Sequence, residues 1–452
     1  MRLFSPGYWN QGSGPDFRNA EFAFDNGPRE RGDVELHVRA SGWYRHKHEN
    51  DPAYGRVKLH VVLENDLSEA MIRHGDRDIP QLALSLHLSS DLGEIIGALD
   101  PAASPVSGAG REAPCCRSAR ALDRNADWIA RLLDVAGDQR MLLKSERLTE
   151  KLAHLAPDEV LYAALMDCMG FSANRTGFRR LCQAAPLSEI RRWVPTDAST
   201  GERQVACEAI LLGVGGFLDA IPPDRLNDAA SAGKAGQLSD TWSRIRPSWP
   251  HEPLPDDAWV LKGTRPANQP LRRAAAMAAF LAAHLHSGLC RAILHAIERV
   301  PADGTERSQC RQALQNLSAL FEVGETGYWS RRAAFGPERL KYPTRLVGPA
   351  RVGEIVVNAL IPLMLALAAE EEMPRIERRL HNLYSGLKPT GDNAVTRYMK
   401  TRIFAEPADA DSIINSSRRQ QGLLQIFHDF CNPSGMTCED CAFLAAVEER
   451  VG

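Results

Sequence analysis

The spacing of the apolar residues changes once along this chain, and that change limits the folds open to it. Up to residue 90 the apolar residues alternate with polar ones, as in strands at 20–24, 33–39, 57–63 and 82–88. From residue 128 onward they recur every three or four positions, as on one face of a helix. The change predicts an α+β protein, with an N-terminal sheet followed by a large, mostly α-helical region.

A change in composition marks a candidate domain boundary. The stretch 89–120 is rich in Gly, Ala, Pro and Ser, which favours a linker over a packed element. With 452 residues the chain is also too long for one ordinary hydrophobic core. We therefore expect a domain at 1–105, one or more helical domains at 120–405, and a C-terminal helix with a cysteine-rich segment at 406–452.

Hydropathy and charge restrict the partners of the chain. No apolar run approaches the roughly 20 residues that span a bilayer, and the longest one, 355–369, is expected to be a buried helix. The first 14 residues lack the pattern of a signal peptide, which predicts a cytoplasmic protein. A formal charge of −3 gives no overall attraction to nucleic acid, so binding of DNA or RNA would need local basic patches.

Asp16, Glu35 and His37 form the pattern with the most chemical content. Glu35 and His37 are two residues apart on a predicted strand, so both side chains leave the same face. Asp16 precedes the neighbouring strand and could reach that face. Two carboxylates can hold Mg²⁺ or Mn²⁺ and leave coordination sites for water and phosphate. The alternative is that these polar residues form the solvated face of a half-covered sheet.

Pro15-Asp16, followed after eighteen residues by Glu35-Leu36-His37, resembles the PD-(D/E)XK nuclease motif with His in place of Lys. This resemblance implies a nuclease-like mixed sheet over 1–105. It also implies that Asp16 and Glu35 are metal ligands and that His37 stands in the position of the Lys that orients the nucleophile. A protonated His37 could take over that role, whereas a neutral His37 could bind the metal.

A loop dense in potential ligands follows the predicted strand of Glu35. His46 and His48 are expected to complete the catalytic site or to bind a second metal, although an isolated His-x-His is more often a surface feature. Tyr54 could contact the substrate or anchor the loop by packing. His60 lies within an apolar strand, where a hydrogen-bonded core histidine is the more common outcome.

Several short motifs along the chain together indicate a family. They are Gly14-Pro15-Asp16-Phe17, Gly32-Asp33-Val34-Glu35-Leu36-His37, Trp43 with His46 and His48, Tyr54 with Leu59-His60-Val61-Val62, Arg265-Pro266-Ala267-Asn268 and the terminal cysteines. On these motifs the whole chain resembles an uncharacterised bacterial family, domain of unknown function 2851, a name that implies no activity. Members of that family usually have more residues before the first motif, so we expect a missing N-terminal helix or a misassigned start.

Basic residues suggest two places for substrate contact. Arg265 and Arg272 flank the predicted start of a helix, where arginines and free N–H groups could bind a phosphate group. An ordinary solvated basic face is the alternative there. The connection 331–351 is also basic and has aromatic residues interleaved, as in segments that contact single-stranded nucleic acid.

Cys431, Cys438 and Cys441 give the spacing C-x6-C-x2-C near the C-terminus. A cytosolic protein has little structural use for three clustered thiols, so the spacing predicts a metal site. Cys115, which follows a proline as in the family, is the first choice for a fourth ligand, with Cys116 beside it. Zn²⁺ and a 4Fe-4S cluster each take four such ligands, so both stay open. The other five cysteines are expected to be buried in helices.

Together these residues predict a metal-dependent phosphodiesterase that acts on DNA or RNA. Asp16 and Glu35 would hold the metal, and His46 and His48 would assist. One alternative is a nucleic-acid-binding or scaffold protein without turnover, which the replacement of Lys by His37 favours. Another is a metal-dependent hydrolase of a different substrate, which the His-rich loop and the acidic net charge favour. Protein partners cannot be predicted from the sequence.

Overall fold

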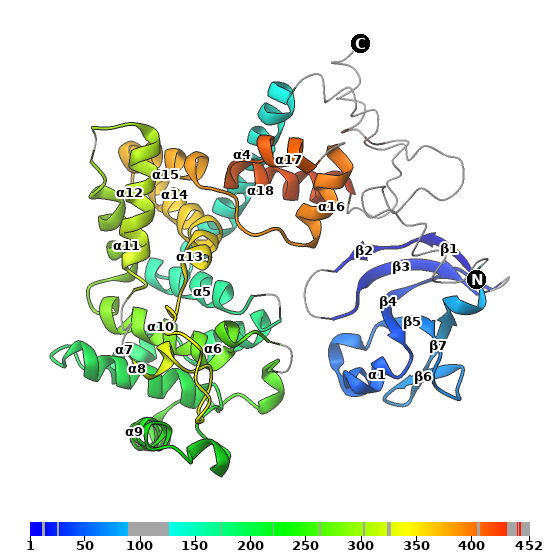
Figure 1. Ribbon diagram of the computed structural model, residues 1–452, viewed down its shortest axis with the longest axis horizontal. Helices are drawn as coiled ribbons and strands as arrows, with labels where there is room; N and C mark the ends of the chain where they lie inside the picture. Colours follow the sequence, from blue (N-terminus) through cyan, green and yellow to red (C-terminus); the bar gives the residue numbers. More distant parts are fainter. Residues whose placement is uncertain are drawn as a thin grey trace. The chain divides into compact units, whose positions relative to one another are not determined.

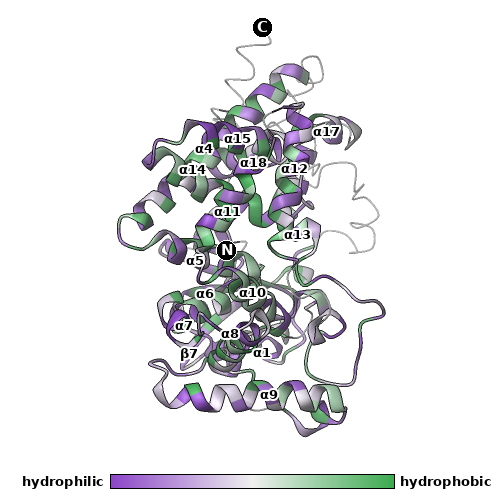
Figure 2. Ribbon diagram, turned by 90° about the vertical axis from the view of Figure 1, so that its left-hand side faces the viewer, coloured by the Kyte–Doolittle hydropathy of each residue, from purple (hydrophilic) through white to green (hydrophobic). Residues whose placement is uncertain are grey.

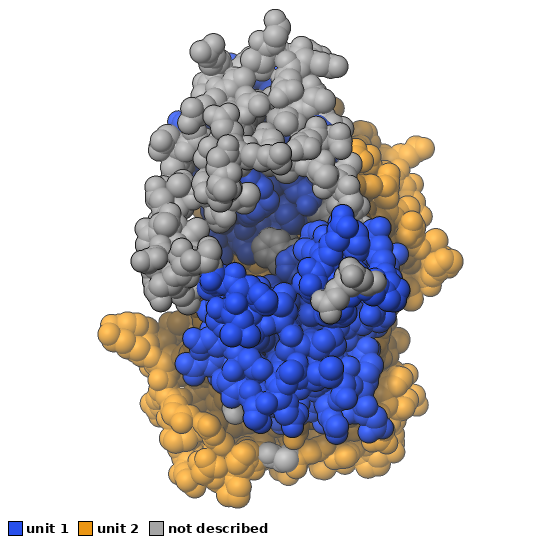
Figure 3. Space-filling model, turned by 90° about the vertical axis from the view of Figure 1, so that its right-hand side faces the viewer, with its two compact units in different colours: residues 1–137, 392–415, 419–452 blue, residues 138–391, 416–418 orange. Residues whose placement is uncertain are grey.

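The computed structural model describes residues 1–10, 14–24, 27–88, 126–171, 173–219, 221–261, 264–301, 303–322, 327–404, 407–431, 441 and 443. Its contacts divide the chain into two units, which Figure 3 colours separately. Unit 1 consists of residues 1–137, 392–415 and 419–452, and unit 2 consists of residues 138–391 and 416–418.

The strands of unit 1 form a seven-stranded mixed sheet (Figure 1). They are β1 (Arg2–Ser5), β2 (Tyr8–Trp9), β3 (Phe17–Ala23), β4 (Glu30–Arg39), β5 (Val57–Glu64), β6 (Met71–His74) and β7 (Arg77–Ala83). Their order is β1-β3-β4-β5-β7-β6, and β2 also pairs with β3. β3 is antiparallel to β4, whereas β4–β5 and β5–β7 are parallel. The predicted sheet is confirmed, but the strand expected at 82–88 is shifted, since β7 ends at Ala83.

The connection from β4 to β5 covers one face of the sheet. Parallel neighbours need such a crossover, and here it consists of α1 (Gly42–Arg45) and two 3₁₀ turns, His48–Asn50 and Pro52–Tyr54. An apolar core forms beneath it from Trp43, Tyr54, Val57, Ile72 and Ile79. This core holds the crossover in place.

The polar side of β4 lies under the crossover. Glu35 is 6% exposed, whereas Leu36 and Val38 are 43% and 69% exposed. The strand therefore alternates as predicted, but its polar face is not the solvated face of a half-covered sheet. The physical reason is that the crossover brings His46 and His48 over this face, so polar groups meet each other there instead of water.

A second, helical part of unit 1 joins segments that are distant in sequence. It contains the start of α4 (Ala126–Leu152), α16 (Ala394–Ile403), α17 (Pro407–Ile413) and most of α18 (Ser417–Ile426). Its core includes Ile129, Leu133, Val395, Met399, Leu423 and Phe427. α18 approaches α4 closely at Gly422, where a Cβ would lie 2.2 Å from the carbonyl oxygen of Leu133.

Unit 2 is built from helices around one large core. They are α5 (Pro157–Met169), α6 (Arg175–Ala184), α7 (Leu187–Trp193), α8 (Thr200–Val214), α9 (Ala229–Ile245), α10 (Pro270–His284), α11 (Leu289–Glu298), α12 (Glu306–Ala319), α13 (Pro349–Ile355), α14 (Ile361–Glu370) and α15 (Pro374–Gly386). The stretch Pro349–Glu370 is long and apolar enough to cross a membrane, but 72% of its most apolar window is buried inside the protein. The buried helix expected at 355–369 is confirmed, but the apolar helical stretch is longer than the sequence indicated, because α13 continues through the π-helical turn Val356–Leu360 into α14.

Gly213 sets the distance between α8 and α9. A Cβ at this position would lie 2.3 Å from the ring of Trp242, so a larger residue would push the two helices apart. In α9 hydrophilic and hydrophobic residues alternate along the helix (Figure 2), and its apolar residues Leu238 and Trp242 are buried. Polar residues of α9 such as Gln237 and Asp240 are exposed at the surface of unit 2.

Candidate metal centre

Three histidines from β4 and the crossover converge on one point. His37 comes from β4, His46 follows α1, and His48 begins the next 3₁₀ turn. Their ligand nitrogens all lie within 4.8 Å of one another, and His37 Nε2 is 3.0 Å from His46 Nδ1. Two nitrogens that each bind one ion at roughly 2.1 Å lie about 3.0–3.4 Å apart, so this spacing fits a shared metal.

The carboxylate of Glu35 lies beside the histidines, and Asp16 lies beside Glu35. Glu35 Oε1 lies 3.5 Å from His48 Nε2 and 3.8 Å from His37 Nε2. The Asp16 N–H donates to Glu35 Oε2 (3.1 Å), and Asp16 Oδ2 accepts from the Leu36 N–H (2.9 Å). The antiparallel pairing of β3 with β4 causes this contact, because it sets the start of β3 beside the middle of β4. The structure thus brings Glu35 together with the three histidines and places Asp16 next to Glu35.

Family membership follows from the comparison with known proteins. The family model described as "Protein of unknown function (DUF2851)" matches residues 1–393. The chain belongs to this family. The match includes the whole sheet and the histidine cluster, and it confirms the resemblance to this family. No curated protein and no solved structure matches the chain significantly. Since the DUF2851 family name conveys no activity, the function has to be argued from the cluster.

A chain of hydrogen bonds determines which nitrogen of His37 carries no proton. The amide nitrogen of Gln81 donates to the Glu69 carbonyl (3.2 Å), so Gln81 Oε1 is the atom that faces His60 Nδ1 (3.0 Å) and accepts its proton. His60 Nε2 must then accept from His37 Nδ1 (2.8 Å). His37 Nε2 therefore carries no proton, and its lone pair, which faces His46 Nδ1 in this structure, can bind a metal ion. Hydrogen-bonded partners orient metal-binding histidines in this way.

Burial keeps the imidazoles of His37, His48 and His60 neutral. It lowers the pKa of His37 to about 3, with a further contribution from the neighbouring histidines, and the pKa values of His48 and His60 to about 4. Burial and the charge of Asp16 raise the pKa of Glu35 to about 8. At neutral pH His37 therefore cannot supply the positive charge of a lysine. Of the two roles open to His37, that of a neutral metal ligand agrees with this environment.

Aromatic rings support the cluster from the apolar core. The ring of Tyr54 stacks on His48 with centroids 3.8 Å apart, and Trp43 meets both rings edge-on. The Trp43 Nε1–H donates to the Arg73 carbonyl (2.9 Å). Tyr54 is buried, so its position favours anchoring of the loop over contact with a substrate.

The two arginines expected at a substrate lie in different environments. Arg272 is 1% exposed and donates to the carbonyl oxygens of Trp329 (2.9 Å) and Thr344 (2.9 Å). Its guanidinium holds the segment that follows α12, which argues against the predicted substrate contact. Arg265 is exposed before the 3₁₀ turn Pro266–Asn268, and its role stays a prediction.

The predicted cysteine site falls only partly on described residues. Cys115, Cys116 and Cys438 lie outside them. Cys431 ends a π-helical turn after α18, and Cys441 packs half-buried against the core of the helical part of unit 1. A Zn²⁺ or 4Fe-4S site at these cysteines stays a prediction. The cysteines within the helices of unit 2 are buried or half-buried, as expected.

Gln81 is the supporting residue that sequence reasoning missed, and its replacement by leucine should weaken metal binding. Leucine removes the acceptor that keeps the His60 proton on Nδ1, so His37 is no longer held in one tautomer. Loss of such a partner lowers metal affinity by roughly 10- to 100-fold. Calorimetric titration with Zn²⁺ or Mn²⁺ measures the effect, and Gln81→Glu, which keeps an acceptor, should retain affinity. Equal affinity of Gln81→Leu and wild type would show that this chain of bonds does not orient His37.

Gly42 allows the crossover to approach His37, and alanine at this position should disturb the cluster. A Cβ at Gly42 would lie 2.6 Å from His37 Cδ2, so the ring would have to move. We expect weaker metal binding and a loss of about 1–3 kcal/mol in the free energy of unfolding. The control Gly236→Ala in α9 places its Cβ where no atom lies within 4 Å and should leave metal binding unchanged. Metal titration and thermal unfolding test both variants, and unaltered metal binding in Gly42→Ala would contradict this position of His37.

Proposed function

We propose that the protein is a metal-dependent phosphodiesterase acting on nucleic acid in the cytoplasm, with the metal held by His37, His46, His48 and Glu35. The observation that carries the proposal is the convergence of three imidazoles on one point, with the buried carboxylate of Glu35 beside two of them. Neutral imidazole suits transition-metal ions, whereas Mg²⁺ prefers oxygen ligands. The donor set therefore favours Mn²⁺ or Zn²⁺ over Mg²⁺. Support for a phosphodiester substrate comes from the resemblance of the spacing of Asp16, Glu35 and His37 to the nuclease motif.

Asp16 is the residue best placed to handle a proton beside this donor set. A bound metal would lower the pKa of its water and stabilise negative charge on a phosphate group. One oxygen of Asp16 accepts from the Leu36 N–H, and burial raises the pKa of the Asp16 carboxyl. A carboxylate with a raised pKa is a better proton acceptor, so we assign to Asp16 the proton of the attacking water.

Cleavage assays with metal-stripped and reloaded protein test this function. Single- and double-stranded DNA and RNA should be cleaved with Mn²⁺ or Zn²⁺, more slowly with Mg²⁺, and not with excess chelator. Glu35→Ala should lose nearly all activity, whereas His87→Ala, which removes an exposed histidine of unit 1, should keep it. Wild-type cleavage by Glu35→Ala would overturn the assignment.

A hydrolase of another substrate is the second candidate. It is favoured by the net charge of −3 and by a ligand set that is not specific to phosphodiesters. A panel of phosphomonoesters, carboxylic esters and amides, offered to the same metal-loaded protein, separates the two functions. Turnover on this panel without cleavage of nucleic acid would favour the second candidate, and metal binding without any turnover would favour a scaffold.

A further inference from the structure

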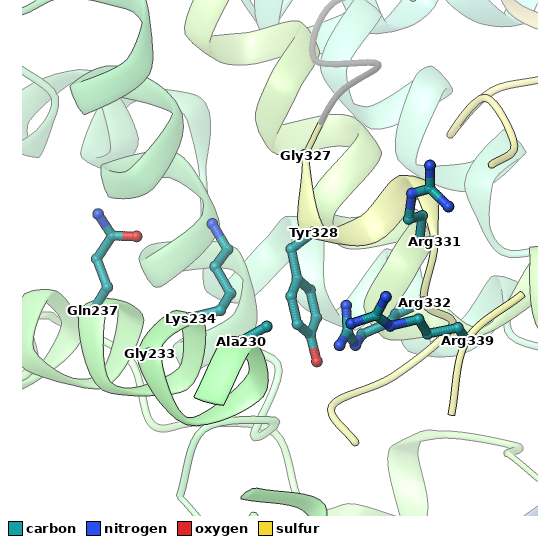
Figure 4. A pocket seen from close by; sticks show the side chains of 9 residues that line it. All are labelled: Ala230, Gly233, Lys234, Gln237, Gly327, Tyr328, Arg331, Arg332 and Arg339. Atoms are coloured by element: carbon teal, nitrogen blue, oxygen red, sulfur yellow. The ribbon is translucent and has the colours of Figure 1, made fainter. Parts of the chain in front are cut away.

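Unit 2 contains a basic pocket that the proposed function does not use. It has a volume of about 690 Å³ and lies between α9 and the residues from Gly327 to Arg339. The polar side chains that line it are Lys234, Gln237, Tyr328, Arg331, Arg332 and Arg339. Figure 4 shows Tyr328 between the side chains of α9 and the three arginines. The pocket therefore gathers four cationic side chains from two distant parts of the sequence.

Two of the four cations are fixed by carboxylates. Lys234 Nζ lies 2.6 Å from the carboxylate of Glu208, whose side chain is fully buried in α8. Arg332 pairs with Asp228 (2.9 Å) and also donates to the Gly336 carbonyl (3.0 Å). These contacts set the position of both cations before any ligand arrives, and they balance their charges.

The other two cations carry charge that the described residues do not balance. Arg331 and Arg339 are exposed, and in the described part of the chain neither guanidinium has a carboxylate partner or a hydrogen bond. Both nevertheless line the same pocket as Lys234 and Arg332. A ligand with two negative charges would match this surplus.

The segment that carries the three arginines is fixed by hydrogen bonds to the rest of unit 2. The buried guanidinium of Arg272 donates to the Trp329 carbonyl (2.9 Å) and to Thr344 Oγ1 (2.6 Å), which anchors both ends of this segment to α10. On the α9 side, the Tyr328 hydroxyl and Ser231 Oγ are hydrogen-bonded (2.6 Å). A pocket whose walls are fixed in this way loses little conformational entropy when it binds a ligand.

We propose that this pocket binds a ligand with adjacent phosphate groups. Arginine presents a planar fork of donors that matches phosphate oxygens, and the two unpaired arginines can each bind one phosphate group. The guanidinium of Arg332 lies 4.7 Å from the centre of the Tyr328 ring, so a cation and an aromatic surface adjoin in the pocket. The volume falls within the roughly 300–1,000 Å³ of small-molecule sites and accommodates a nucleotide-sized group.

Adjacent phosphates occur in nucleoside diphosphates and in the backbone of single-stranded nucleic acid. The first probe is therefore fluorescently labelled ADP, and the second is a labelled oligothymidylate of about 12 nucleotides, within the ~4–16 that single-strand sites cover. Fluorescence anisotropy measures binding of each probe to the full chain. A chelator in the buffer removes metal ions, so the probes cannot bind through a metal at the histidine cluster. Unlabelled pyrophosphate should compete with whichever probe binds.

The decisive comparison is between two double charge reversals. Arg331→Glu with Arg339→Glu should weaken binding by about tenfold or more, because both unpaired cations are lost. Arg307→Glu with Arg311→Glu changes the net charge equally on exposed residues of α12 and should weaken binding by no more than about twofold. Thermal unfolding checks that each variant is folded, and Arg331→Gln with Arg339→Gln replaces the first pair if reversal prevents folding.

Comparison of the two probes decides the source of the phosphates. Tight binding of ADP indicates a nucleotide site, and binding of the oligothymidylate alone indicates a backbone site; either result supports the proposal. If the wild type binds neither probe, the proposal is overturned. Equal losses in the two double variants would also overturn it, because binding would then depend on overall charge and not on this pocket.

Discussion

Alanine in place of His37 is expected to lower the affinity for Mn²⁺ or Zn²⁺ by more than about a hundredfold, since it removes a ligand and not only a supporting partner. The reason lies in the position of His37. Its Nδ1 is committed to His60, and its Nε2 lies between His46 and Glu35, so no other side chain can replace it. Equilibrium dialysis followed by elemental analysis gives the metal content and the affinity.

The control for this variant is His87→Ala, which removes an exposed histidine of the same unit and should bind metal like the wild type. Circular dichroism should show that both variants keep their secondary structure. If His37→Ala binds metal as tightly as His87→Ala does, the ion lies elsewhere and the histidine cluster is a buried polar network without a metal.

Metal affinity should rise with pH up to about pH 8 and then level off. The pKa of Glu35 is raised to about 8, so below that pH an incoming ion must displace the proton of this carboxyl. His37 and His48 do not add to this dependence above about pH 5, because burial lowers the pKa of His37 to about 3 and that of His48 to about 4. We expect an increase of about tenfold in affinity for each pH unit below 8.

Calorimetry in two buffers of different ionisation enthalpy measures this coupling directly. About one proton should be released for each ion bound near pH 7, and none well above pH 8. The matched variant is Glu35→Gln, which keeps the shape of the side chain but cannot ionise. It should bind metal more weakly and lose the pH dependence. An affinity that is flat between about pH 6 and pH 8 in the wild type would show that Glu35 is not a ligand.

The parts of the site that depend on local sequence were predictable. Glu35 and His37 share one face of β4, and Asp16 directly precedes β3, the strand before β4 in sequence, so the antiparallel pairing of β3 with β4 is enough to bring the three together. His46 and His48 follow within the crossover that any parallel β4–β5 pair requires. The alternation of β4 did not reveal which of its faces the crossover would cover.

The supporting residues depend on contacts that no local pattern encodes. Gln81 meets His60 only because of the register between β5 and β7, and the strand expected there was placed several residues too late. Arg272 could be recognised as basic, but its burial depends on how α10 packs against residues more than fifty positions away. Arg331 and Arg339 could be noticed in the sequence as part of a basic segment. Lys234 and Gln237 of α9 could not, because they join the same pocket only through the packing of α9.

The measurement that tests the metal centre most directly is anomalous X-ray diffraction from crystals soaked in Mn²⁺ or Zn²⁺. A single strong peak is expected among His37, His46, His48 and Glu35, at roughly 2.0–2.2 Å from the ligand nitrogens. The direct hydrogen bond between His37 Nε2 and His46 Nδ1 should then be replaced by two bonds to the ion. A saturating soak that leaves this hydrogen bond in place, with no anomalous peak at the cluster, would contradict the account.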